Sequence, residues 1–194
     1  MPKQIINEGH RGYFPLQNCS EGFKKCLTNG ADGIETDLWL MKDNNILVHH
    51  GLTSMGLLEL IDKKTQKKIR IYARDLVKDD LKNYLDQNSN QPMITLTELL
   101  EIFKVNEKVY LNLEIKDHRI ECFNQIMNIL ERVKPKNEIQ ISSFNLKFKS
   151  TLSDYIKKSN FTKKFSFGFL AKNQEQLDQI LLLLGFYFTM NFIY

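Results

Sequence analysis

Two patterns of apolar residues alternate along most of the chain. Short apolar segments rich in β-branched and aromatic residues predict strands at 4–8, 33–40, 46–49, 109–115, 139–144, 165–170 and 187–193. Apolar residues spaced three and four positions apart predict helices at 20–29, 97–103, 120–133, 146–157 and 174–184. Strands that alternate with helices in this way are typical of a parallel sheet covered by helices.

The predicted strands favour a closed barrel. No glycine-rich dinucleotide fingerprint accompanies them, which argues against an open doubly wound sheet. We therefore expect an α/β fold of the TIM (β/α)8-type barrel class. Such barrels commonly contain about 250 residues, whereas this chain has 194. The expectation is a single barrel domain over residues 1–194, truncated after the seventh strand.

Residues 52–93 interrupt the alternation. This stretch is charged and polar, with short apolar pieces at 57–61 and 69–72. It is too long for a plain loop in a compact domain. We expect an inserted segment with some structure of its own, whose basic residues between Lys63 and Arg70 face solvent.

Composition excludes several functional classes. The chain carries 27 basic and 23 acidic residues, spread along its length, for a net charge of +4. A nucleic-acid partner is not expected, because such proteins cluster Lys and Arg on one face. The three cysteines have no CxxC spacing, which indicates reduced thiols rather than a disulfide framework or a zinc site.

The two ends of the sequence differ in character. The first residues contain no apolar stretch typical of a signal peptide, so we expect a cytoplasmic protein. Residues 180–194 are strongly apolar, but they are fewer than the about 20 residues of a membrane span and contain Gly185, Thr189 and Asn191. We expect a buried helix end, a turn and a strand here, with weak membrane association through this segment as the alternative.

Candidate catalytic residues lie near the ends of successive predicted strands. His10 follows the first strand, Glu35 and Asp37 lie toward the end of the second, His49 ends the third and Glu114 lies near the end of the fourth. In a (β/α) barrel these strand ends converge on one mouth. Two carboxylates two positions apart share a face of their strand and repel each other unless a cation lies between them.

The residue types suggest a divalent cation and a phosphate. Glu35, Asp37 and Glu114 together supply hard oxygen ligands of the kind preferred by Mg²⁺ or Ca²⁺. Lys116 and Arg11 are placed to contact phosphate oxygens. Each residue alone has an ordinary structural interpretation, such as a hydrogen-bonding histidine or a surface ion pair. Only their coincidence at one mouth favours a catalytic site.

Six motifs resemble those of the glycerophosphodiester phosphodiesterase family in order and spacing. They are His10-Arg11-Gly12, the segment 30–37, Lys42-Asp43, Leu47-Val48-His49, the segment 111–116 and the segment 141–144. The resemblance covers roughly residues 5–170. It implies a TIM barrel with a segment inserted after the third strand.

The resemblance also implies an activity: metal-dependent hydrolysis of glycerophosphodiesters to glycerol 3-phosphate and an alcohol, in lipid metabolism. It implies that His10 and His49 are the acid and base and that Lys116 contacts the substrate phosphate. It further implies that Glu35, Asp37 and Glu114 hold the metal. The expected partner is a small glycerophosphodiester or a lysophospholipid.

Two positions depart from the family pattern. Gln17-Asn18 stands where the family has Pro-Glu-Asn, and His50 stands where it has Asp after the second histidine. The site therefore lacks one carboxylate and one acidic partner. Two alternatives stay open: a lysophospholipase D-like activity on single-chain lipids, and a truncated, non-catalytic phosphate-binding protein.

Overall fold

The core of the protein is a mixed seven-stranded sheet. The computed structural model describes residues 6–148, 150–151 and 165–183. The strands run in the order β12-β11-β10-β4-β5-β9, and β1 pairs with β4 beside this path. Their bounds are β1 Glu8–His10, β4 Gly33–Leu40, β5 Ile46–Val48, β9 Ile94–Thr95, β10 Tyr110–Ile115, β11 Ile139–Ser143 and β12 Phe165–Phe169.

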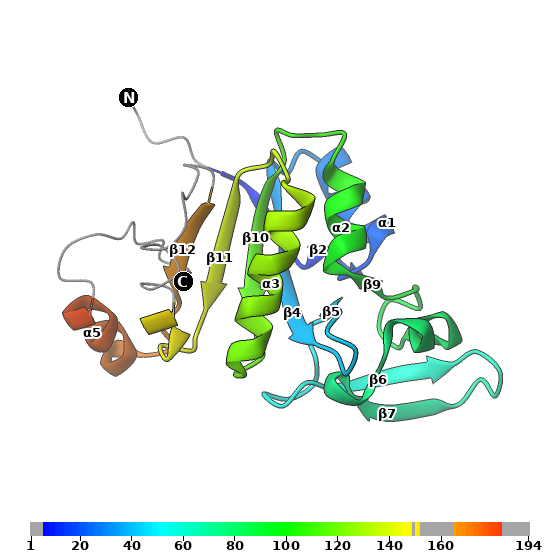
Figure 1. Ribbon diagram of the computed structural model, residues 1–194. Coiled ribbons are helices and arrows are strands. Elements are labelled where there is room, and N and C mark those ends of the chain that lie inside the picture. Colours follow the sequence, from blue (N-terminus) through cyan, green and yellow to red (C-terminus); the bar gives the residue numbers. More distant parts are fainter. Residues whose placement is uncertain (1–5, 149, 152–164, 184–194) are drawn as a thin grey trace.

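Helices cover the sheet. The described helices are α1 Ser20–Thr28, α2 Leu96–Phe103, α3 Ile120–Val133 and α5 Gln174–Leu183. In Figure 1, α2 and α3 lie side by side over the central strands. They pack there because Leu99, Phe123 and Ile126 form one apolar cluster with Ile34 and Leu113 of the sheet. None of the described helices has the length and apolar character needed to cross a membrane.

The parallel strands confirm the predicted α/β class. Neighbouring strands β1, β4, β10, β11 and β12 are all parallel to one another. The predicted strand at 33–40 and helix at 120–133 coincide with β4 and α3. The first strand begins later than expected, at Glu8. The predicted helix at 146–157 lies largely outside the described residues, and the predicted strand at 187–193 lies wholly outside them.

The third predicted strand is not part of the parallel series. β5 pairs antiparallel with β4, with Leu38 opposite Val48, and β9 pairs antiparallel with β5. The expectation of a parallel strand is wrong here because only a tight turn separates β4 from β5, closed by a 2.9 Å bond from Met41 N–H to Asn45 O. A parallel crossover needs a dozen or more residues. As a result β5 runs back along β4, and His49 N–H donates to Asp37 O at 2.9 Å.

Two short antiparallel units complete the fold. β2 Gly12–Tyr13 and β3 Leu16–Gln17 form a hairpin after β1. β6 Leu57–Asp62, β7 Lys68–Tyr72 and β8 Tyr84–Asp86 form a sheet in the order β7-β6-β8, with 3-10 turns at Ala73–Asp75 and Lys78–Asn83. This second sheet projects from the body at the lower right of Figure 1. It has its own apolar cluster, formed by Leu58, Leu60, Leu76 and Leu81 around Trp39 and Leu47.

Both ends of α1 are capped. Cys19 is the N-cap, and its Sγ accepts a bond from Gly22 N–H at 3.4 Å. Gly30, with φ of +92°, follows the helix end, where glycine is favoured. This helix packs behind the β2–β3 hairpin, which follows directly on His10 and Arg11. It therefore supports the backbone that carries the first motif.

Candidate active site

Strand register brings the predicted acidic residues together. His10 lies opposite Glu35 in the β1–β4 pair, and Glu114 lies opposite Asp37 in the β4–β10 pair. Residues opposite each other on neighbouring strands share a face of the sheet. Glu35 and Asp37 also share that face, since they are two positions apart on β4. Three parallel strands therefore present one group of polar side chains.

The three carboxylates form a buried cluster. One carboxylate oxygen from each of Glu35, Asp37 and Glu114 lies within 4.8 Å of the other two. Glu35 Oε1, Asp37 Oδ1 and Glu114 Oε1 are buried; Glu35 Oε1 has no hydrogen-bond partner among the described residues, whereas Lys116 Nζ lies within ion-pair distance of the other two. Buried polar atoms normally have partners. Three converging carboxylates, one of them with an unpartnered buried oxygen, form a donor set suited to a hard divalent cation.

Electrostatics supports this assignment. Burial, followed by the charge of Asp37, raises the pKa of Glu35 from 4.5 to about 8. Burial also raises the pKa of Glu114, against the opposing effect of Lys116. Carboxylates this close together repel each other when more than one of them is ionised. A bound cation would relieve that repulsion.

Basic groups surround the cluster. The Lys116 ammonium lies 2.7 Å from Glu114 Oε1 and 3.3 Å from Asp37 Oδ1. Arg11 Nε lies 3.3 Å from Asp37 Oδ2, and Arg11 N–H donates to Glu35 Oε2 at 3.0 Å. Arg11 adopts a φ of +59°, a left-handed conformation that is uncommon outside glycine. The chain therefore turns sharply after β1, which aims the Arg11 amide at Glu35.

Asn18 was not singled out by the sequence, but it holds the cluster in place. It is buried, donates to Asp37 Oδ2 at 3.2 Å, and accepts from Thr36 Oγ1 at 2.6 Å. Its backbone N–H donates to Arg11 O at 2.8 Å. The signal lay in the Gln17-Asn18 pair, where Asn18 keeps the amide of the family's Pro-Glu-Asn motif. Gln17 supplies no carboxylate, so the expected loss of one acidic group is seen.

His10 lies at the edge of the carboxylate cluster. His10 Nε2 lies 3.8 Å from Glu35 Oε2, and its side chain is 71% exposed. Burial of part of the ring, together with the charges of Arg11 and Lys116, lowers the pKa of His10. The histidine is therefore neutral over most of the physiological pH range and open to a ligand.

The two adjacent histidines occupy different environments. His49 is 7% exposed, and both of its ring nitrogens have partners: Nε2 lies 2.9 Å from Asp86 Oδ2, and Nδ1 accepts from Gly51 N–H at 2.8 Å. His50 is half-buried, and burial together with the charges of Arg11 and Lys116 lowers its pKa, while Asp37 opposes that shift. The charged groups of the cluster therefore interact electrostatically with His50. The predicted catalytic role of His49 stays a prediction.

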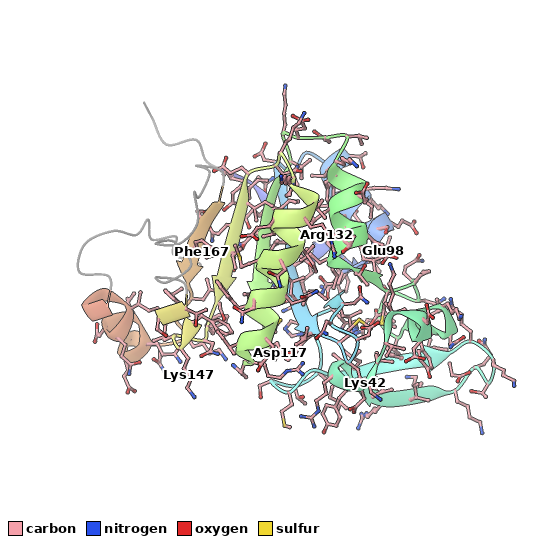
Figure 2. The ribbon with its side chains drawn as sticks, viewed as in Figure 1. Lys42, Glu98, Asp117, Arg132, Lys147 and Phe167 are labelled. Carbon is pink, nitrogen blue, oxygen red and sulfur yellow. The ribbon has the colours of Figure 1, made fainter. Side chains whose placement is uncertain are left out.

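A cavity of about 230 Å³ opens beside the cluster. Its lining includes Trp39, His50, Glu114, Lys116, Phe144 and Lys172. The ammonium groups of Lys116 and Lys172 lie 5.6 Å and 5.0 Å from the centre of the Phe144 ring. The cavity thus has an aromatic wall and two cationic groups next to a candidate metal site. Figure 2 shows Asp117, which follows Lys116, at the end of the sheet toward which β10 points.

The sequence thus located the cluster, and the structure adds two residues to it. His10, Arg11, Glu35, Asp37, Glu114 and Lys116 come together as expected. Asn18 and His50 join them, and Asp86 contacts His49 from the inserted segment. Nothing in a linear pattern links Asp86 to His49, because the two residues are 37 positions apart and meet only through tertiary packing.

Comparison with known proteins agrees with the site. The uncharacterized protein YqiK from Bacillus subtilis (strain 168) is 29% identical over 153 residues, and a glycerophosphodiester phosphodiesterase from Bacillus altitudinis is 25% identical over 152 residues. Each match covers 75% of this chain. The chain spans 59% of the length of these curated relatives.

Solved structures share the fold. The crystal structure of a protein from Galdieria sulphuraria, described as a glycerophosphodiester phosphodiesterase, superposes with a TM-score of 0.70 at 20% identity. It covers 92% of this chain and 72% of its own. This likeness confirms the expected TIM-barrel-type fold. Residues 8–179 match the glycerophosphoryl diester phosphodiesterase family. The chain belongs to the glycerophosphoryl diester phosphodiesterase family.

Proposed function

We propose that the protein hydrolyses glycerophosphodiesters to glycerol 3-phosphate and an alcohol with the help of a divalent cation. The observation that carries this proposal is the buried cluster of Glu35, Asp37 and Glu114, whose carboxylate oxygens converge beside Lys116 and Arg11. Carboxylates would hold the cation, and the basic side chains would receive the phosphate. The name of the Bacillus altitudinis relative supports the same substrate class.

The residues present fit Mg²⁺ or Ca²⁺ better than softer metals. All three converging ligands are carboxylate oxygens, which suit hard cations, and no cysteine or histidine belongs to the set. When bound, the cation would polarise a phosphoryl oxygen and stabilise the negative charge that develops there. Lys116 and Arg11 would hold the remaining phosphate oxygens. Asn18 would keep Asp37 oriented.

We assign proton transfer to His10 and His50. One imidazole removes the proton from the nucleophile, which is water or the glycerol hydroxyl of the substrate, and the other protonates the leaving alcohol. His10 is exposed beside Glu35, and His50 lines the cavity beside Glu114 and Lys116. His49 is less suited, because both of its ring nitrogens are already engaged. The lowered pKa of His10 and His50 favours the neutral form that the base needs near pH 7, and the charge of Asp37, which opposes that shift at both rings, favours the protonated form that the acid needs.

The cavity beside the cluster is suited to the alcohol portion of the substrate. Its walls combine Trp39 and Phe144 with polar groups, an arrangement common in small-molecule sites. A volume of about 230 Å³ is below the range of about 300–1,000 Å³ typical of drug-sized ligands. A compact alcohol is therefore a better occupant than a long acyl chain. The size of the cavity therefore favours the glycerophosphodiester activity over the lysophospholipase D-like alternative.

Release of glycerol 3-phosphate from glycerophosphocholine, and of choline from lysophosphatidylcholine, tests the proposal. Glycerophosphocholine and lysophosphatidylcholine would be offered with Mg²⁺, with Ca²⁺, and after treatment with EDTA. We expect metal-dependent release from glycerophosphocholine, at least about 100-fold slower in Asp37→Asn. Glu98→Gln is the matched control, because Glu98 is a hydrogen-bonded carboxylate on α2 outside the cluster. Cation binding without hydrolysis of either diester would leave the non-catalytic phosphate-binding alternative.

A further inference from the structure

A buried pair joins the inserted segment to the strand end next to the candidate site. His49 Nε2 lies 2.9 Å from Asp86 Oδ2, and each residue is only 7% exposed. Asp86 is the last residue of β8, in the sheet that projects from the body. Its other oxygen accepts from Ser89 N–H at 2.7 Å and from Ser89 O–H at 2.8 Å. Both oxygens of the Asp86 carboxylate therefore have hydrogen-bond partners.

The second ring nitrogen of His49, Nδ1, is hydrogen-bonded to the loop that follows His50. This nitrogen accepts from Gly51 N–H at 2.8 Å. A neutral imidazole has one donor and one acceptor nitrogen, so an acceptor at Nδ1 requires the proton at Nε2. Asp86 favours this tautomer, since a carboxylate accepts a hydrogen bond but does not donate one. The contact with Asp86 and the contact with Gly51 thus support each other.

His50 lies between His49 and Gly51, which the hydrogen bond from Gly51 N–H to His49 Nδ1 connects. Its carbonyl oxygen accepts from Trp39 Nε1–H at 3.2 Å. Gly51, with a φ of +78°, turns the chain immediately afterwards, and a Cβ there would lie 3.4 Å from the Trp39 ring. The backbone of His50 is therefore fixed on both sides. His50 lines the cavity together with Glu114 and Lys116.

We propose that Asp86 acts through His49 as a positioning residue that orients His50 beside the carboxylate cluster. On this account the inserted segment supplies part of the catalytic apparatus. The inference rests on the proposed function, since it gives His50 a role in proton transfer. A shift of about 1 Å in a catalytic group can reduce a rate by about 100-fold. Substrate affinity should change little, because other residues contact the phosphate.

Asp86→Asn tests the inference by removing the charge while preserving size. We expect kcat for glycerophosphocholine to fall about 10- to 100-fold, with KM changed by less than about twofold. Nitrogen NMR of labelled histidine should show His49 protonated at Nε2 in the wild type and a mixture of tautomers in the variant. A purely structural role would lower stability without changing kcat or the tautomer.

Glu98→Gln provides a matched control. Glu98 Oε2 accepts from Thr95 N–H and Thr95 O–H, each at 2.8 Å, much as Asp86 accepts from Ser89. Glu98 lies on α2 and does not belong to the carboxylate cluster; Figure 2 labels it on that helix. This variant should lose stability while keeping wild-type kcat. Glu98 is more exposed than Asp86, so the comparison separates loss of a hydrogen-bonded carboxylate from loss of His50 positioning.

Ser89→Ala is the second variant, for the case in which Asp86→Asn does not fold. It removes one hydrogen bond to Asp86 and should lower kcat by a smaller factor in the same direction. Wild-type kcat in the folded variants, with the His49 tautomer unchanged, would overturn the inference. If the wild type hydrolyses no diester, the proposed function fails. The NMR comparison then decides separately whether Asp86 sets the state of His49.

Discussion

The stability of the metal-free protein should fall as the pH rises through neutrality. The pKa of Glu35 is raised from 4.5 to about 8, first by burial and then by the charge of Asp37. An acid whose pKa is higher in the folded state stabilises that state at low pH, because the folded protein keeps a proton that the unfolded chain has lost. This advantage is complete below pH 4.5 and is lost by about pH 8.

The magnitude follows from the size of the shift. Each pH unit between the two pKa values corresponds to about 1.4 kcal/mol. Between pH 6.5 and 8 the free energy of unfolding should therefore fall by roughly 2 kcal/mol. Glu114, whose pKa is also raised by burial, acts in the same direction. The lowered pKa of His10 and His50 affects stability mainly below pH 6.5, so this window isolates the carboxylates.

A divalent cation should reverse the trend. A nearby positive charge favours the ionised carboxylate, so cation binding should lower the pKa of Glu35 and stabilise the protein more at pH 8 than at pH 6.5. The assay is urea unfolding at several pH values, with EDTA or with Mg²⁺. Glu35→Gln is the matched variant, since its amide stays neutral and its oxygen can still accept from Arg11 N–H.

The outcome can refute the reasoning in two ways. Metal-free wild-type protein could be equally stable at pH 6.5 and 8, within about 0.5 kcal/mol. Alternatively, Glu35→Gln could show the same pH dependence as the wild type. Either result would mean that Glu35 is not a buried protonated acid in the metal-free protein. The electrostatic argument for a cation at the cluster would then be lost.

Three further predictions concern single residues. His50→Ala should lower kcat for glycerophosphocholine by at least about 100-fold, measured by release of glycerol 3-phosphate; near-wild-type turnover would remove His50 from the mechanism. Lys172→Glu should raise the inhibition constant of glycerol 3-phosphate about 3- to 10-fold, because exposed charges contribute up to about 1 kcal/mol each; an unchanged constant would place the anion elsewhere in the cavity. Gly22→Ala should unfold at lower temperature by calorimetry, since its Cβ would meet the Leu16 carbonyl; an unchanged Tm would contradict the close packing of α1 on the hairpin.

The sequence predicted the parallel strands and the acidic cluster well, because both depend on local patterns. Alternating apolar residues defined β4, and the spacing of Glu35 and Asp37 placed both carboxylates on one face. Strand order then brought in Glu114. The antiparallel course of β5 was missed, although the Lys42-Asp43-Asn44-Asn45 turn is too short for a parallel crossover.

Tertiary contacts explain what the sequence could not supply. Two histidines stand side by side at positions 49 and 50, and neither residue type nor spacing says which one faces the cluster. The answer depends on Asp86, which the inserted sheet delivers to His49 from 37 residues away. Asn18 was likewise hidden, because its contact with Asp37 requires the turn after β1.

The most direct measurement is an anomalous-scattering map of crystals soaked in Mn²⁺. The account predicts one ion bonded to Glu35, Asp37 and Glu114 at distances of about 2.0–2.6 Å, with His10 and His50 near its open side. An ion bound elsewhere, with the three carboxylates left uncoordinated, would contradict the claim that these side chains form a metal site.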